Sequence, residues 1–228
     1  MFFAPFLILF AFIFFAVVAL LFALLQIGVI RYAFDALGLP PELAFTALLV
    51  SLLGSYINIP ISRVEGGAHH DAEFVRFFSV RYPVPVRPEG SGTIVAINIG
   101  GAIVPMLISL YVLIHQSSAI VPALFGITIV AATIHQWARP VRGLGIAIPM
   151  FIPPIVAATA AWILSIVFGG PQHIDAIAYV SGTLGTLIGA DLANLGKLND
   201  LGAPVASIGG AGTFDGVFLT GIVAVLLA

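Results

Sequence analysis

Two aspartates in the C-terminal quarter of the chain stand within or close to apolar runs, where a charged side chain is unexpected. Asp191 lies in LIGADLANL and Asp215 in GGAGTFDGVFLTG. A charged carboxylate at the centre of a bilayer costs at least ~2.5 kcal/mol, so it is normally paired, protonated or in contact with water. Two carboxylates close together share a proton, and such a pair can activate water or bind and release a proton or cation. Asp191 and Asp215 are therefore the candidate site residues: catalytic if the protein is a protease, and ion- or substrate-binding otherwise.

The spacing of the two aspartates is compatible with a helical hairpin. They are 24 residues apart, and the midpoint Ala203 lies between Gly202 and Pro204. A turn at Ala203 would make the last two helices antiparallel and place each carboxylate at most about 18 Å from the turn, at 1.5 Å per residue. The alternative is that each aspartate caps a helix or bonds to the local backbone, and the sequence leaves both open.

Two asparagines stand beside residues that loosen helices. Asn58 lies in YINIPIS and Asn98 in NIGGAIVP. In lipid, a backbone carbonyl freed by a helix break needs a protein or water partner, so such breaks face a bundle interior or a cavity. Paired broken helices are also typical of transporter sites. Asn58 and Asn98 are therefore candidate ion- or substrate-binding neighbours of the aspartates, with close helix packing by glycine as the alternative.

The composition identifies the solvent around most of the surface. The chain has 228 residues, of which 61% are hydrophobic and 8% are charged. A soluble domain carries about 25% charged residues, so lipid must cover most of this one. The net charge of −2 gives no support for nucleic-acid binding, and the lack of cysteine excludes disulfides and thiolate zinc sites. No nucleotide-binding motif occurs, and we expect no cofactor and no metal.

The apolar runs predict an all-α protein, a polytopic transmembrane helix bundle of about seven spans in a single domain, 1–228. Charged and polar residues separate the runs, and a helix needs about 20 residues to cross the hydrocarbon core. The predicted spans are 2–30, 43–61, 93–114, 119–134, 144–168, 176–193 and 204–228.

The distribution of Lys and Arg gives the predicted orientation. With seven spans, one side of the membrane carries seven basic residues and the other carries only Arg31. Basic loops face the cytoplasm, so we expect the N-terminus inside, the C-terminus outside, and a cytoplasmic loop at 62–92 in the plasma (inner) membrane. The seven are Arg63, Arg76, Arg81, Arg87, Arg139, Arg142 and Lys197.

Several stretches resemble a bacterial and archaeal membrane-protein family, domain of unknown function 1614. They are GSYINIP, LIGADLANL, GAPVASIGGAGTFDG and the terminal FLTGIVAVLLA. The resemblance extends over most of the chain. It implies a polytopic membrane protein and no particular activity.

A second resemblance concerns the two aspartates alone. GADLANL and GAGTFDGVFL are similar to the paired motifs of presenilin-type intramembrane proteases, Tyr-Asp and Gly-x-Gly-Asp, at the cytoplasmic ends of adjacent helices. Here Ala190 replaces the tyrosine, two residues separate Gly212 from Asp215, and no Pro-Ala-Leu segment follows. The resemblance implies an aspartyl protease in which Asp191 and Asp215 are catalytic.

Three classes of function remain open. We favour a small transporter or channel-like protein for a proton, cation or small solute. The alternatives are a non-catalytic subunit of a larger membrane complex and a presenilin-like intramembrane aspartyl protease. The expected partners are the lipid bilayer and a membrane-protein partner or a second copy of the chain, with no nucleic acid.

Overall fold

The computed structural model describes most of the chain from residue 27 onward. Asp215, most of the predicted first span and most of the predicted 62–92 loop lie outside the described residues. For residues 74–77, 80–83, 140, 145 and 198–200 it describes the backbone alone. The described residues are 14–15, 17–18, 27–64, 74–77, 80–83, 92–141, 145–200, 205–210 and 216–228.

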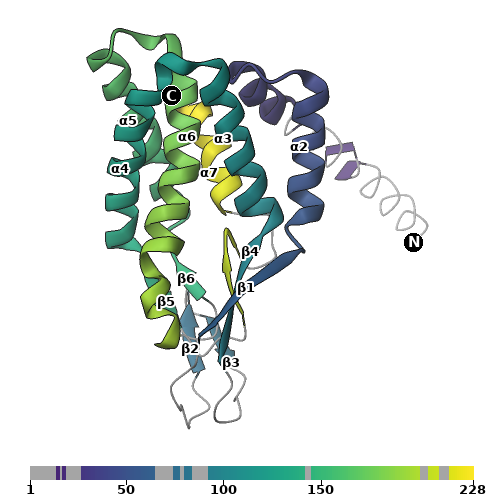
Figure 1. The fold of residues 1–228 in the computed structure, drawn as a ribbon. Coiled ribbons are helices and arrows are strands. Elements are labelled where there is room, and N and C mark those ends of the chain that lie inside the picture. Colours follow the sequence, from purple (N-terminus) through teal and green to yellow (C-terminus); the bar gives the residue numbers. More distant parts are fainter. Residues whose placement is uncertain are drawn as a thin grey trace, which may run out of the picture.

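Helices form one bundle that makes up the larger part of the molecule (Figure 1). A helical stretch at 27–36 precedes the labelled helices. Prolines stand in the first turn of α2, α3 and α5, where an amide hydrogen would have no helical partner anyway. The labelled helices are α2 (Pro41–Gly54), α3 (Val104–His115), α4 (Ile120–Trp137), α5 (Ile152–Val167), α6 (Ile174–Thr186) and α7 (Gly216–Leu227).

Helix α6 lies at the centre of the bundle and packs against α3, α4, α5 and α7. Its neighbours come close because glycines stand at the contacts. A Cβ added at Gly185 of α6 would lie 2.6 Å from the Cβ of Val130 on α4. One added at Gly221 of α7 would lie 2.5 Å from Thr183 Cγ2 and 2.8 Å from the Tyr179 ring, both on α6. Small residues at these contacts are typical of helix packing in membranes.

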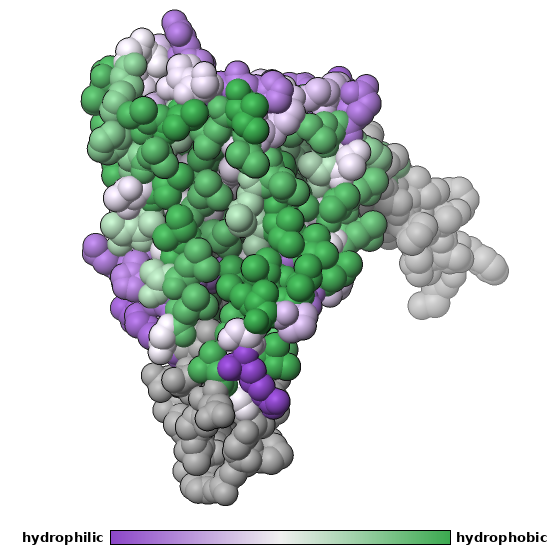
Figure 2. All heavy atoms as spheres, in the orientation of Figure 1, coloured by the Kyte–Doolittle hydropathy of each residue, from purple (hydrophilic) through white to green (hydrophobic). Residues whose placement is uncertain are grey.

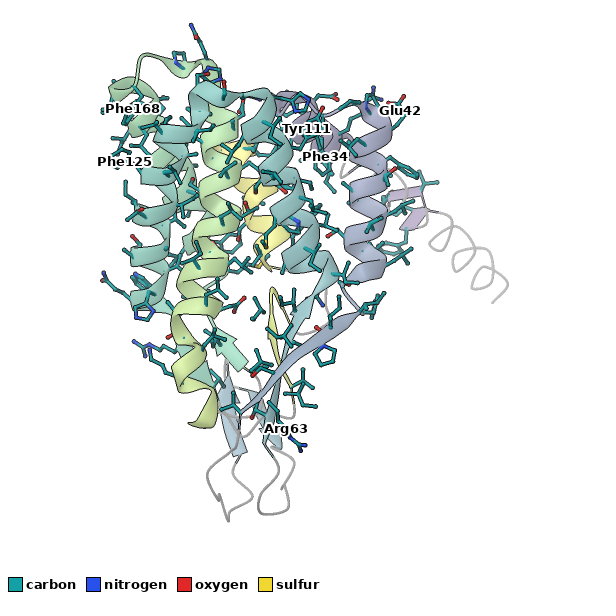
Figure 3. All side chains as sticks on the ribbon, in the orientation of Figure 1. Phe34, Glu42, Arg63, Tyr111, Phe125 and Phe168 are labelled. Atoms are coloured by element: carbon teal, nitrogen blue, oxygen red, sulfur yellow. The ribbon has the colours of Figure 1, made fainter. Side chains whose placement is uncertain are left out.

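Apolar side chains also cover the outside of the bundle, where a soluble protein would be polar. Figure 2 shows a broad apolar band on one face, with hydrophilic residues near its ends. Phe45 on α2, Leu107 on α3 and Trp162 on α5 are among the exposed large hydrophobic residues. Glu42 and Arg63, in contrast, lie toward opposite ends of the molecule (Figure 3).

Two helical stretches in the described residues are long and apolar enough to cross a membrane. They are Ser117–Trp137, with 21 residues, and Pro171–Lys197, with 27 residues. Together with the apolar outer surface, they indicate a membrane protein.

Short strands gather at one end of the bundle, which we call the base (Figure 1). A three-stranded sheet has the order β1-β4-β7, in which β4 pairs antiparallel with β1 and parallel with β7. Two hairpins, β2–β3 and β5–β6, accompany it. The strands are β1 (Asn58–Val64), β2 (Phe74–Phe77), β3 (Val80–Pro83), β4 (Thr93–Asn98), β5 (Arg139–Val141), β6 (Gly145–Ala147) and β7 (Val205–Ile208).

The mostly helical fold that the sequence predicts is confirmed, but four predicted spans are not helical throughout. Each of the spans 43–61, 93–114, 144–168 and 204–228 includes part or all of a strand at its base-side end. The last one contains β7, a turn and α7, and the 12 residues of α7 extend only about 18 Å. A short apolar run has no periodicity that separates a strand from a helix, which explains the difference.

The helices are irregular where they reach the base. A π-helical turn, η1 (Ile99–Ile103), leads from β4 into α3. The π-helical turn η4 (Leu187–Asp191) and the 3-10 helix η5 (Leu192–Asp200) continue α6. The residues that loosen the chain after Asn98 therefore occupy a real irregularity, and π turns are frequent at functional sites.

Candidate functional site

Asn98 lies at the junction of β4 and η1 and is 1% exposed. Its Nδ2 donates to the Ser55 carbonyl at 2.7 Å and to Asn58 Oδ1 at 3.1 Å. Its Oδ1 accepts a hydrogen bond from the Gly101 amide at 2.8 Å. Asn98 therefore joins the end of α2, the start of β1 and the first turn of η1, and its side chain is fully engaged in holding them.

Asn58 extends this cluster to the third strand of the sheet. Its Oδ1 also accepts a hydrogen bond from the Ser207 hydroxyl of β7 at 2.5 Å. The two asparagines that the sequence singled out thus contact each other, and Ser207 joins them. We call Asn58, Asn98 and Ser207 the strand junction. Its hydrogen bonds connect the sheet, which assigns it a positional role.

Asp191 ends η4 and is half-buried. Its Oδ2 accepts a hydrogen bond from the Gly209 amide at 2.7 Å, in the turn that follows β7. Gly209 has a φ of 85°, and a Cβ there would lie 2.6 Å from the Ala102 Cβ and 2.7 Å from the Gly101 carbonyl carbon. Only glycine fits this left-handed, tightly packed position without strain. The turn therefore presses against η1 and directs its amide toward Asp191.

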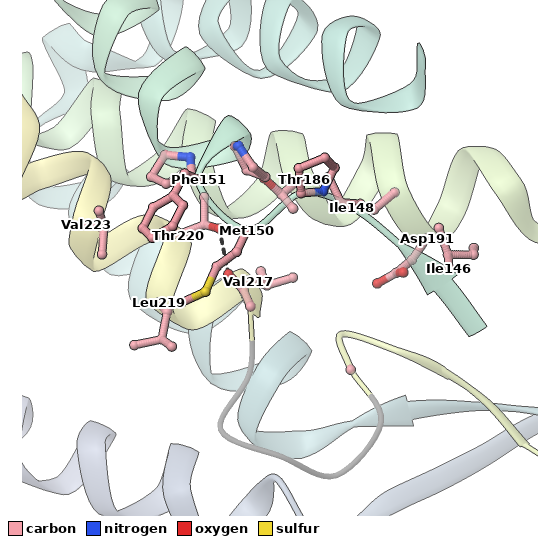
Figure 4. A pocket seen from close by; sticks show the side chains of 16 residues that line it. Ile146, Ile148, Met150, Phe151, Thr186, Asp191, Val217, Leu219, Thr220 and Val223 are labelled. Atoms are coloured by element: carbon pink, nitrogen blue, oxygen red, sulfur yellow. Dashed lines mark hydrogen bonds between the residues drawn. The ribbon is translucent and has the colours of Figure 1, made fainter. Parts of the chain in front are cut away.

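A cavity of about 270 Å³ lies between α5, the α6–η4 helix and α7, and Asp191 lines it. Figure 4 shows the Asp191 carboxylate and Thr186 on the same helix, across from residues of α7. Most of the lining is apolar. The lining residues are Ile146, Ile148, Pro149, Met150, Phe151, Pro153, Pro154, Thr186, Ala190, Asp191, Gly210, Gly216, Val217, Leu219, Thr220 and Val223.

Thr186 and Asp191 are the polar side chains of this lining that carry unused hydrogen-bonding capacity. Thr186 is 3% exposed, and its hydroxyl has no partner among the described residues. Asp191 has one described partner for its two oxygens. The third polar side chain, Thr220, already donates to the Gly216 carbonyl at 2.5 Å.

The charge on Asp191 has no basic partner in the described parts of the chain. The ion pair there is Arg31 with Asp35, at 3.7 Å, near the other end of the bundle. Lys197 instead donates to Asn194 Oδ1 at 2.7 Å. The cavity is therefore electrostatically suited to a positive ligand.

The structure brings the predicted site residues only partly together. Asn58 and Asn98 meet, and Asp191 connects to their sheet through Gly209, but neither asparagine lines the cavity. Asp215 lies outside the described residues, so its distance from Asp191, on which the protease hypothesis depends, stays untested. No group of three metal-binding side chains occurs in the described residues.

Thr186 was not among the predicted site residues. It lines the cavity, and its buried hydroxyl has no hydrogen-bond partner among the described residues. It lies five residues before Asp191 in a predicted span. Threonine is common in membrane helices, where it usually bonds to its own helix, so the residue type alone gave no signal.

The bundle, its apolar surface and the buried polar base define a helical protein of the membrane class. Within that class, the chain belongs to the family described as protein of unknown function (DUF1614), whose model matches residues 52–227. The resemblance to this family is confirmed. No curated protein and no solved structure matches the chain.

Proposed function

We propose that this protein is a multi-pass plasma-membrane protein of the transporter or channel type, which binds and moves a proton, cation or small solute at Asp191. One observation carries the proposal. The Asp191 carboxylate, without a basic partner in the described residues, lines a cavity where helix α6 becomes irregular. Acidic side chains with this placement in membrane bundles mark ion and substrate pathways.

The arrangement of the helices supports the seven-span topology. Successive helices run in alternate directions, so their connections fall at two opposite ends (Figure 1). Among the basic side chains described, Arg63, Arg139 and Lys197 belong to connections at the base, and Arg31 belongs to the other end. The base then faces the cytoplasm, the N-terminus is inside and the C-terminus is outside.

The irregular backbone around Asp191 supports a transport site. The π turn η4 and the turn at Gly209 both bring non-α-helical backbone to the cavity, and η1 packs against Gly209. Non-helical backbone at membrane depth is tolerated where it is buried in protein or lines a water-filled cavity. Transporter sites are typically formed by such interrupted helices, whose unwound carbonyls can coordinate a cation.

The test is ion flux through the purified full-length protein in liposomes. Proton uptake is followed with an enclosed pH-sensitive dye under an imposed potential, with and without a sodium gradient. We expect flux above that of protein-free liposomes, and we expect Asp191→Asn to reduce it to that background. Asparagine keeps the shape and can still accept the hydrogen bond from Gly209, so the change removes charge and proton binding with little effect on folding.

Asp175→Asn is the matched control. Asp175 is a half-buried acid in the first turn of the same helix α6, at the opposite end from the cavity. Its variant should retain full flux. Equal flux for the wild type and Asp191→Asn would reject Asp191 as the transport site.

A further inference from the structure

We propose that the cavity beside Asp191 binds a small organic ammonium ion, a protonated amine with an apolar body. This inference deepens the proposed function, on which it rests, by naming the class of solute. It follows from the apolar lining of the cavity, from two polar side chains with unused hydrogen-bonding capacity, and from the lack of free amide donors at the start of α5.

The apolar lining favours an organic ligand over a bare metal ion. Side chains such as Ile148, Met150, Val217 and Val223 form most of the wall, and Asp191 is its only described carboxylate. Calcium takes six to eight oxygen ligands and magnesium takes six, several from water or carboxylates, which this wall does not offer. An ammonium group needs one carboxylate, and the apolar wall then contacts the rest of the molecule.

Thr186 supplies the second polar contact. Its hydroxyl is buried and has no partner among the described residues, which is unfavourable unless a ligand provides one. An ammonium group has three N–H donors, so it can donate to Asp191 and to the Thr186 hydroxyl at once. The π turn lies between these two residues, which are five apart on one helix and both line the cavity.

Helix α5 starts beside the cavity, and a helix N-terminus is ordinarily an anion site, but this one offers an anion no free amide donor. Here Pro153 and Pro154 have no amide hydrogen. The amides of Ile152 and Ile155 already donate to the carbonyls of Pro149, at 3.1 Å, and Phe151, at 3.3 Å. The first four residues of α5 thus leave no amide for a carboxylate or phosphate.

The size of the cavity restricts the ligand further. Its volume of about 270 Å³ lies just below the ~300–1,000 Å³ of common small-molecule sites. A compact amine fits this volume, whereas a lipid-sized molecule does not.

The experiment measures binding of three probes of the same shape to the purified full-length protein by calorimetry at neutral pH. The probes are cyclohexylmethylamine, its neutral analogue cyclohexylmethanol, and cyclohexanecarboxylate. We expect the amine to bind at least about 10-fold more tightly than the alcohol, because it forms a charge-assisted hydrogen bond to Asp191. The carboxylate should not bind measurably.

Two substitutions in the cavity locate the binding energy. Asp191→Asn should abolish the preference for the amine over the alcohol. Thr186→Val, which has the same shape, should weaken amine binding about 2- to 10-fold by removing one hydrogen bond, while the melting temperature stays the same or rises. A merely structural threonine would instead lower the melting temperature and leave amine binding unchanged.

Tyr179→Phe is the matched control for Thr186→Val. Tyr179 also carries a buried hydroxyl without a described partner, but it does not line the cavity. Its variant should bind the amine as the wild type does.

The inference is overturned if the alcohol binds as tightly as the amine, or if Asp191→Asn keeps the preference for the amine. These outcomes are separate from those of the flux assay. Flux that depends on Asp191 without amine binding would retain the transport site and reject the solute class. Amine binding without flux would retain the ligand and reject transport.

Discussion

Buried polar side chains in the bundle and at the base form opposite kinds of hydrogen bond. In the bundle, Ser181 donates to Ile177 O at 2.6 Å and Thr183 donates to Tyr179 O at 2.7 Å, each within its own helix. At the base, Asn98 bonds across 40 residues to Asn58, and Asn58 bonds across 149 residues to Ser207. The bonds within α6 only duplicate bonds that the helix already makes, and the Ser109 and Thr183 hydroxyls, 2.9 Å apart, add one contact between α3 and α6. The base, in contrast, depends on its side chains for its arrangement.

The two regions therefore obtain their order from different sources. The bundle is held together mainly by close packing at glycines such as Gly185 and Gly221. The base depends on a few polar groups, and the cavity with Asp191 lies beside them. Substitutions in the bundle and at the base should therefore affect different properties of the molecule, which can be measured separately.

The largest expected change in stability is at the strand junction. Asn98→Ala leaves the buried Gly101 amide and the Ser55 carbonyl without this partner. We expect a loss of about 3 kcal/mol of stability, from the desolvated groups left unpaired. Thermal unfolding of the purified variant in detergent measures it.

The matched substitution in the bundle is Ser181→Ala. Its hydroxyl bonds only to carbonyls of its own helix, so we expect a loss of about 0.5–1 kcal/mol. Equal losses for the two variants would contradict the claim that the base depends more on side-chain hydrogen bonds than the bundle does.

A loss between those of Asn98→Ala and Ser181→Ala is expected from Gly221→Ala in the bundle. The added Cβ would overlap Thr183 and the Tyr179 ring on α6, so we expect a loss of about 2 kcal/mol from overpacking. Gly28→Ala is the control, because nothing lies within 4 Å of a Cβ at that exposed helical position. Its thermal stability should stay the same or rise, and a similar fall in both variants would contradict the packing explanation.

One further expected change has the opposite sign. Tyr179→Phe removes a buried hydroxyl that has no described partner, so we expect a gain of about 1 kcal/mol in stability. Ser109→Ala serves as the contrast, since its hydroxyl bonds to Pro105 O at 2.8 Å and lies 2.9 Å from the Thr183 hydroxyl. That variant should lose stability, and a loss in Tyr179→Phe as well would mean that the tyrosine hydroxyl is satisfied.

The same contrast explains what the sequence could predict of the fold. The predicted spans 119–134 and 176–193 correspond to α4 and to α6 with η4, because long apolar runs can only be satisfied as helices in lipid. The sequence did not predict the strands β4 and β7. Their parallel pairing places Ile94 beside Val205, and no local sequence pattern predicts a contact between residues so far apart in the chain.

The candidate site divides in a similar way. The sequence singled out Asp191 because a carboxylate in an apolar run has few structural uses, and the structure places it in the lining of the cavity. The sequence suggested Asn58 and Asn98 as neighbours of the aspartates. Their hydrogen bond to each other, and the bond from Ser207 to Asn58, depend on the sheet and were not predicted. The sequence could not predict a role for Thr186. That role is suggested by its buried hydroxyl, which has no hydrogen-bond partner among the described residues. Asp215 stays a prediction from the sequence.

The hydrogen bond from Gly209 to Asp191 also has a consequence for signalling across the molecule. A charged carboxylate accepts an amide hydrogen bond more strongly than a neutral one, so a proton or cation that neutralises Asp191 loosens its hold on the turn after β7. That strand is hydrogen-bonded to β4. A partner that binds the sheet at the base and favours one position of β7 would then change the affinity of Asp191 for its ligand. By linkage, the ligand would change the affinity of the protein for that partner by the same factor. Strand β7 would in this way couple the occupancy of the cavity to the face of the protein at its base.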